Sequence, residues 1–264
     1  MSYFFSNNLK LSYQTAGSGE PLVLIAGITC DNQHWSLIKE QLSKYFWLIM
    51  PDNRGVGKSE TPNVDYEISD MAQDIITLLE HLNISKTHIL GHSLGGAVAQ
   101  YLAAFHPEKV NKLIISHSFV KFRPSSIMFC EHDYLLQESR AAPMARATGI
   151  LPFIYSDEFI NDSGNVESFI QNISASKNQQ SLHSYKQQIK VISKFDSTDY
   201  LHNVSAETLV VSGKSDKLAP PQDSIQIIQK ISHAQHQEIK GAHVPMWEIP
   251  ETYIDIIKKF LTTM

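Results

Sequence analysis

Hydrophobic residues along the chain form short continuous runs that alternate with longer segments of helical periodicity. A short apolar run bounded by turn residues is typical of a strand that is buried on both faces. Such runs lie at residues 3–5, 9–13, 22–26, 46–50, 87–90, 110–116, 208–211 and 236–239. Apolar residues at i, i+3 and i+4 spacing lie at residues 35–45, 68–82, 95–105, 225–231 and 253–261. The first two runs predict a hairpin, and the alternation of the others predicts a parallel sheet with crossover helices.

The helix predicted at 68–82 has polar residues near its start. Ser69, Asp70 and Asp74 place capping or acidic groups in its first turn. The positive end of a helix dipole stabilises such groups, so they support a helix that begins at this point.

The alternation stops between about residues 119 and 203. This stretch is irregular and rich in aromatic residues and methionine, except for an amphipathic pattern that predicts a helix at about 181–194. Because the strand pattern resumes at 208, we expect an insertion that covers one edge of the sheet as a lid. The sequence therefore predicts an α/β fold with an eight-stranded, mostly parallel sheet flanked by helices. Its core is expected at residues 1–120 and 204–264, with a helical cap at 121–203 inserted after the sixth strand.

Composition and charge narrow the class of function. The chain has 264 residues, 42% of them hydrophobic, with 22 basic and 27 acidic residues and a net charge of −5. This balance offers no basic surface for nucleic acid or an anionic membrane. Residues 1–14 lack a basic segment followed by an apolar one, which favours a cytoplasmic protein. Cys30 and Cys130 lie too far apart in sequence for a thiolate metal motif, and no metal or other cofactor is predicted.

The segment HILGHSLGGAVAQ places a serine between a predicted strand and a predicted helix. In Gly91-His92-Ser93-Leu94-Gly95, the glycines allow the backbone to pass closely through a strained strand-to-helix turn. Such a turn exposes the Ser93 hydroxyl above the carboxyl edge of the sheet. We therefore expect Ser93 to be a nucleophile, whereas the neighbouring His92 is expected to pack beside the site.

A serine nucleophile needs a base and a group that orients the base. His243 lies in GAHVP, a loop between the last predicted strand and the last predicted helix. Asp216 lies in SGKSDKLAP, after the strand predicted at 208–211. The order Ser93, Asp216, His243 is the order of roles expected of a nucleophile, an acid and a base in this topology.

Four segments of the chain resemble the α/β-hydrolase superfamily. They are PLVLIAGIT, PDNRGVGKSE, GHSLGG, and the pair SGKSDKLAP and GAHVP. The resemblance implies Ser93 as nucleophile, Asp216 as the acid and His243 as general base. It also implies an oxyanion hole formed by the backbone N–H groups of Ile28 and Leu94. Many relatives have a histidine where this chain has Ala26, which changes the support of the oxyanion loop.

Two other patterns in the sequence allow different interpretations. Gly57-Lys58-Ser59 resembles the end of a phosphate-binding loop, but the required earlier glycine is replaced by Asp52. Lysines also line one flank of the predicted helix at 181–194. Lys186, Lys190 and Lys194 could dock an acidic carrier protein, as in esterases of biotin synthesis within this family, although a solvated helix face is the favoured interpretation.

The expected activity is hydrolysis of a carboxylic ester or lactone of a small to medium acyl substrate, with an acyl-enzyme on Ser93. A serine nucleophile argues against the dehalogenase and epoxide-hydrolase branches. C–C bond hydrolases and cofactor-free haloperoxidases use the same triad and stay open as alternatives. A non-catalytic small-ligand receptor on the same fold is the alternative from another class.

Overall fold

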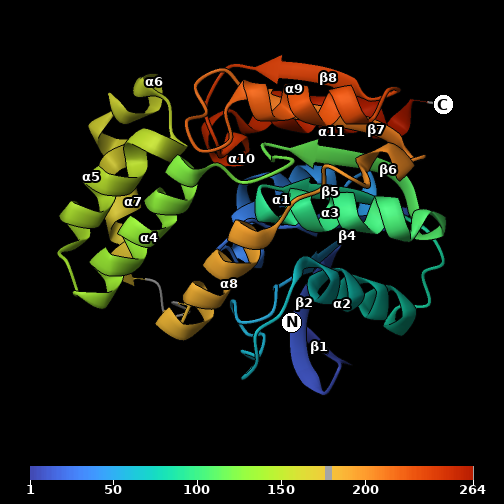
Figure 1. Ribbon diagram of the computed structural model, residues 1–264. Helices are drawn as coiled ribbons and strands as arrows, with labels where there is room; N and C mark the ends of the chain where they lie inside the picture. Colours follow the sequence, from blue (N-terminus) through green and yellow to red (C-terminus); the bar gives the residue numbers. More distant parts are fainter. Residues whose placement is uncertain (176–179, 264) are drawn as a thin grey trace.

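The computed structural model describes residues 1–175 and 180–263, and within these residues the strands form one sheet. Its order is β1-β2-β4-β3-β5-β6-β7-β8, with antiparallel pairing in β1–β2 and β2–β4 and parallel pairing elsewhere (Figure 1). The strands are β1 (Ser2–Ser6), β2 (Leu9–Ala16), β3 (Glu20–Ile25), β4 (Phe46–Pro51), β5 (Thr87–His92), β6 (Val110–Ser116), β7 (Glu207–Gly213) and β8 (Gln235–Ile239). The predicted eight-stranded, mostly parallel sheet is confirmed.

Helices cover both faces of this sheet. They are α1 (Ser36–Leu42), α2 (Ile68–His81), α3 (Leu94–Phe105), α9 (Pro221–Lys230), α10 (Pro245–Glu248) and α11 (Pro250–Thr262), with 3-10 turns η1 (Asn32–Trp35), η2 (Pro107–Lys109) and η3 (Leu201–Asn203). Val23 and Ile25 of β3 pack in the same core as α2, α3 and α9, whereas Leu22 and Leu24 pack in the core of α1 and α11. Two covered faces explain why the central strands read as continuous apolar runs. None of the described helices is long and apolar enough to cross a membrane.

A group of helices between β6 and β7 forms a layer of its own beside the sheet (Figure 1). We call them the cap helices: α4 (Pro124–Glu138), α5 (Pro143–Ile154), α6 (Asp157–Ile160), α7 (Ser163–Ala175) and α8 (Leu182–Lys194). They lie after the sixth strand, as predicted, and α8 matches the amphipathic pattern. The periodicity of α4 is weak because its buried residues include the polar Ser126 and Asp133, whereas Met128 and Leu135 are exposed. The division of the chain at residues 121 and 203 stays a prediction.

The loop after β4 is fixed by an ion pair that the sequence did not indicate. Arg54 donates from Nε to one carboxylate oxygen of Asp74 at 2.7 Å and from Nη2 to the other at 2.8 Å. Both side chains are buried, and the Arg54 guanidinium lies 5.0 Å from the centre of the Tyr66 ring. Asp74 was expected to act on the helix dipole in the first turn of α2. That expectation is wrong, because Asp74 lies beyond the first turn and binds Arg54, while Asp70 caps the helix by accepting from the Glu67 N–H.

We expect Asp74→Asn to lower the free energy of unfolding by about 3–5 kcal/mol, because the substitution leaves the buried Arg54 charge without its partner. Asp65→Asn is the matched control, since Asp65 pairs with Lys190 at 3.1 Å on the surface and both side chains are largely exposed. The control is expected to cost about 0–1 kcal/mol. Urea unfolding measures both, and equal losses in the two variants would contradict the prediction.

Candidate active site

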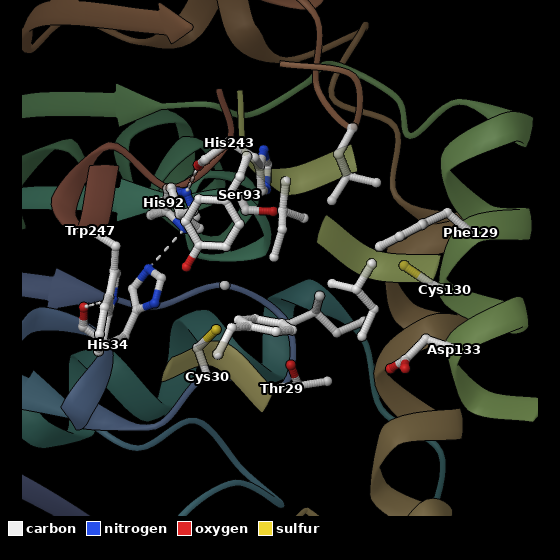
Figure 2. Close-up of a pocket in the computed structure, with 18 of the residues that line it drawn as sticks. Thr29, Cys30, His34, His92, Ser93, Phe129, Cys130, Asp133, His243 and Trp247 are labelled. Atoms are coloured by element: carbon white, nitrogen blue, oxygen red, sulfur yellow. Dashed lines mark hydrogen bonds between the residues drawn. The ribbon is translucent and has the colours of Figure 1, made fainter. Parts of the chain in front are cut away.

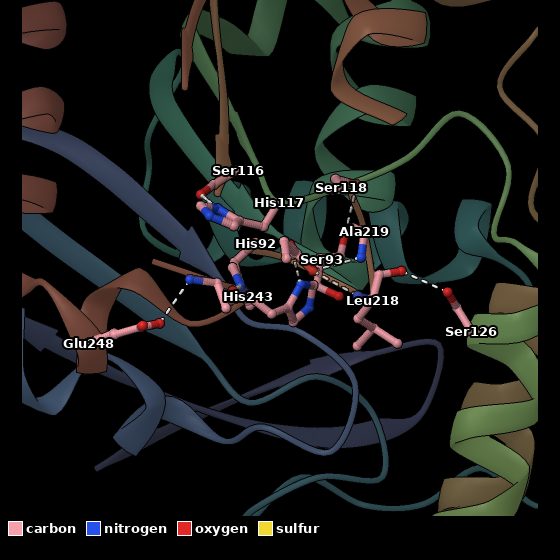
Figure 3. Close-up of polar contacts among 12 residues, drawn as sticks. His92, Ser93, Ser116, His117, Ser118, Ser126, Leu218, Ala219, His243 and Glu248 are labelled. Carbon is pink, nitrogen blue, oxygen red and sulfur yellow. Dashed lines mark hydrogen bonds and ion pairs between the residues drawn. The ribbon is translucent and has the colours of Figure 1, made fainter. Parts of the chain in front are cut away.

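Ser93 occupies a sharp turn between β5 and α3. Its backbone angles are φ 54° and ψ −119°, a conformation that is strained for a residue with a side chain. There is no room for side chains around it: a Cβ on Gly95 would overlap the Ile25 carbonyl. The turn is also held by hydrogen bonds, because the Ser93 N–H donates to the Ser116 carbonyl at 3.0 Å and Ser118 Oγ donates to the Ser93 carbonyl at 2.9 Å. Figure 3 shows Ser118 above this turn.

His243 and Asp216 form a buried hydrogen-bonded pair. His243 Nδ1 lies 2.8 Å from one carboxylate oxygen of Asp216, and the other oxygen accepts from the N–H groups of Leu218 and Ala219 at 2.9 and 2.8 Å. Because a carboxylate only accepts, Nδ1 of His243 carries the proton and Nε2 is left as the basic nitrogen. Figures 2 and 3 both show the His243 side chain next to Ser93. The structure therefore brings together the three residues predicted as nucleophile, acid and base.

Ser93 and His243 line a cavity of about 550 Å³ that lies between the sheet and the cap helices. Ile28 also lines it, and its backbone N–H donates to no other described residue. The same is true of the Leu94 N–H, at the first residue of α3. Both amides are thus available to a ligand bound at Ser93.

The loop that carries Ile28 is supported from two sides. Asn53 donates from Nδ2 to the Ala26 carbonyl at 3.0 Å. On the other side, the Thr29 N–H donates to Oε1 of Gln188 on α8 at 3.0 Å. Thr29 has φ 64°, so this contact holds a strained residue directly after Ile28. Ala26 is visible in the sequence as a departure, but the supports from Asn53 and Gln188 are long-range side-chain contacts, which leave no local pattern.

The loop that carries His243 is held by both the core and the cap. The His243 N–H donates to the Ile154 carbonyl at the end of α5 at 3.0 Å. Glu248 accepts from the Ala242 N–H at 2.8 Å and from the Ser156 N–H at 3.2 Å, so that one carboxylate links the loop to the cap (Figure 3).

His92 does more than pack beside Ser93. Its Nε2 donates to the His243 carbonyl at 2.7 Å, and its Nδ1 lies 3.2 Å from Nε2 of His34 (Figure 2). Since the carbonyl can only accept, Nδ1 of neutral His92 accepts from His34. Burial, aided by the neighbouring His243, lowers the pKa of His34 from 6.5 to about 3, and burial also lowers the pKa of His92 well below 6.5. His34 and His92 are therefore a neutral pair that ends on the loop of His243.

A third buried histidine lies behind His243. Nδ1 of His117 is 2.8 Å from Ser116 Oγ, and its ring centre is 6.2 Å from that of His243 (Figure 3). Burial lowers the pKa of His117 from 6.5 to about 4. No group of three or more side chains within the described ranges is arranged to hold a metal ion.

Two other groups of residues that the sequence pointed to, at the phosphate-loop pattern and on α8, lie outside this cavity. Asp52, which breaks the phosphate-loop pattern, is buried and accepts from Ser12 Oγ and from Asn32 Nδ2 at 2.5 and 2.7 Å. On α8, Lys190 pairs with Asp65 and Lys186 lies over the Tyr134 ring, so docking of a carrier protein stays a prediction.

Known proteins resemble the chain over nearly its whole length. It is 26% identical over 252 residues to 3-oxoadipate enol-lactonase 2 of Acinetobacter baylyi, covering 94% of this chain and 91% of that one. It is 24% identical to pyrrolizixenacetamide deacetylase of Xenorhabdus hominickii, covering 96% and 94%. The crystal structure of the enol-lactonase from Burkholderia xenovorans LB400 superposes with a TM-score of 0.88 at 22% identity, covering 99% and 100%.

The match to a family model is equally extensive. Residues 20–250 match the model of the alpha/beta hydrolase fold, a span that contains Ser93, Asp216 and His243. The order of the strands and the position of the cap helices after β6 agree with that fold. The chain therefore belongs to the alpha/beta hydrolase fold family.

Proposed function

We propose that this chain is a serine hydrolase that cleaves a carboxylic ester or lactone through an acyl-enzyme on Ser93. The observation that carries the proposal is the buried hydrogen bond of 2.8 Å between His243 and Asp216 beside Ser93, at the wall of the cavity. Similarity to an enol-lactonase over nearly the whole chain supports a lactone or ester as substrate.

In the proposed mechanism, Nε2 of His243 takes the proton of Ser93 Oγ as the oxygen attacks the substrate carbonyl. Asp216 keeps the imidazole in the tautomer that leaves Nε2 basic, and stabilises the imidazolium that forms. The amides of Ile28 and Leu94 donate to the oxyanion, and each such donor contributes about 3–4 kcal/mol to transition-state stabilisation. His243 then protonates the leaving oxygen, and water attacks the acyl-enzyme with His243 as base.

Gln188 acts in this mechanism as a positioning residue. An oxyanion donor must be aimed before the reaction, because reorientation during the reaction would cost the stabilisation that it supplies. Gln188 holds Thr29 in its left-handed conformation, and Thr29 follows Ile28 directly. The cap helix α8 thereby sets the direction of an oxyanion donor in the core.

The neutral His34–His92 pair acts on the base in a similar way. His92 is hydrogen-bonded to the carbonyl of His243 itself, so it fixes the backbone from which the imidazole projects. A protonated His34 would be a buried charge, which costs desolvation free energy, and it would repel protonated His243. The low pKa of His34 keeps this pair neutral throughout the physiological range.

Ser93→Ala is expected to lower kcat on nitrophenyl esters by a factor on the order of 10⁶, since the three residues act as a unit. Labelling by a fluorophosphonate probe should disappear with it. Ser224→Ala is the control, because the Ser224 hydroxyl is buried without a partner among the described residues and lies on α9. Folded wild-type protein that neither hydrolyses a panel of esters and lactones nor takes up the probe would instead indicate a ligand receptor.

Gln188→Leu removes the acceptor for the Thr29 N–H. Loss of one such hydrogen bond is expected to lower kcat about tenfold with little change in KM, because the oxyanion forms only in the transition state. Gln187→Leu is the matched control one residue earlier on α8, where Gln187 donates to the Val64 carbonyl at 3.2 Å. Steady-state kinetics on one nitrophenyl ester separate the variants, and a change confined to KM would argue against the positioning role.

Acid should destabilise the protein below pH 6.5, because His34 and His117 bind protons in the unfolded chain but stay neutral in the folded one down to about pH 3 and 4. Their contribution is complete above pH 6.5, and each is expected to remove about 1.4 kcal/mol of unfolding free energy per pH unit below it. Between pH 6 and 4, His34→Asn should reduce the slope of unfolding free energy against pH by about 1.4 kcal/mol per pH unit. Urea unfolding at several pH values measures this, with exposed His202→Asn as control; an unchanged slope in His34→Asn contradicts the assignment.

A further inference from the structure

The cavity contains an ion pair on the wall opposite to Ser93. Asp133 of α4 and Arg146 of α5 both line the cavity that Ser93 and His243 line. Figure 2 shows the Asp133 carboxylate pointing into the cavity, across from Ser93 and His243. The pair is therefore part of the space that a bound substrate would occupy.

The two charges are tightly joined and almost completely shielded from bulk water. Arg146 Nε lies 3.1 Å from one Asp133 oxygen and Nη2 lies 3.4 Å from the other, which also accepts from Gln137 Nε2 at 2.7 Å. The side chains of Arg146 and Asp133 are 17% and 8% exposed. A buried pair is weak evidence for stability, because apolar residues of similar volume often serve the fold as well. Its place on the cavity wall gives it a further role.

Phe129 and Ile150 line the same cavity as the pair. Arg146 and Asp133 both line the cavity, so guanidinium donors and carboxylate acceptors lie side by side in its wall. A ligand group that both donates and accepts hydrogen bonds matches this arrangement, as a primary amide or a hydroxyl does. A carboxylate would be attracted by Arg146 but repelled by Asp133 at nearly the same distance, and a methyl group would gain no hydrogen bond from either side chain.

We propose that Asp133 and Arg146 form a subsite for the far end of the acyl group, selecting substrates that end in an uncharged amide or hydroxyl over those that end in a carboxylate or methyl group. The proposal rests on the proposed function at Ser93, because it assumes that the acyl chain extends from there across the cavity. It adds a substrate class: esters or lactones with a neutral, hydrogen-bonding tail.

The test uses nitrophenyl esters whose acyl chains have matched lengths and end in amide, hydroxyl, methyl or carboxylate. For wild-type protein, we expect kcat/KM at the best chain length to be about tenfold higher for the amide than for the methyl tail, as one or two gained hydrogen bonds allow. The carboxylate tail should be the poorest. A wild-type preference for the methyl or the carboxylate tail overturns the proposal.

Asp133→Asn removes the repelling charge and leaves Arg146 unopposed. This variant should raise kcat/KM for the carboxylate tail about tenfold and invert its rank against the amide tail. Asp157→Asn is the matched control. Asp157 is the first residue of α6, its carboxylate lies 3.9 Å from Lys217 Nζ, and it does not line this cavity. If Asp133→Asn does not fold, Arg146→Lys replaces it as the test. Lysine keeps the positive charge but lacks the planar set of guanidinium donors, so this variant should have a smaller preference for the amide tail. An unchanged tail ranking in the folded variant counts against the subsite.

Calorimetry separates this proposal from the proposed function. Hexanamide, hexanol and hexanoate are titrated into Ser93→Ala protein, which requires no turnover. Tighter binding of hexanamide and hexanol than of hexanoate supports the subsite even if the wild-type protein hydrolyses no ester. The reverse order overturns the subsite even if nitrophenyl acetate is hydrolysed and the fluorophosphonate probe labels Ser93.

Discussion

The turn from β5 into α3 is the constraint on which the rest of the site depends. A non-glycine residue at φ 54° costs on the order of 1–3 kcal/mol, and the surrounding structure must hold it there. The hydrogen bonds that do so come from Ser116 and Ser118, at and just after the end of β6. The parallel pairing of β5 with β6 therefore determines where the Ser93 hydroxyl points, and the same stretch of chain leads directly into the cap.

Sequence reasoning reached the fold and the three polar residues because each leaves a local signal. Continuous apolar runs identify strands with both faces covered, and the glycines around Ser93 mark a turn too crowded for side chains. Asp216 and His243 follow predicted strands, so the topology alone brings them to one edge of the sheet.

The rest of the site could not be found in this way, because it depends on contacts between distant segments. Gln188 supports Thr29 from a position 159 residues away, and His92 binds a carbonyl 151 residues away. The helical cap and α8 were predicted, but the separate helices α4 to α7 were not located. The buried face of α4 includes the polar Ser126 and Asp133, so no apolar stripe marks this helix, and Asp133 gives no local sign that its partner is Arg146.

The hydrogen bond from the His243 amide to the Ile154 carbonyl has a consequence for how such a protein changes over evolutionary time. Exchange of the whole cap for that of a relative would take away the acceptor of this amide, together with the Gln188 side chain that holds Thr29. A chimaera of that kind would begin with a displaced His243 and a loosened loop at Ile28 and Thr29. New substrate ranges are therefore more accessible through single substitutions on the inner wall of the existing cap than through module exchange.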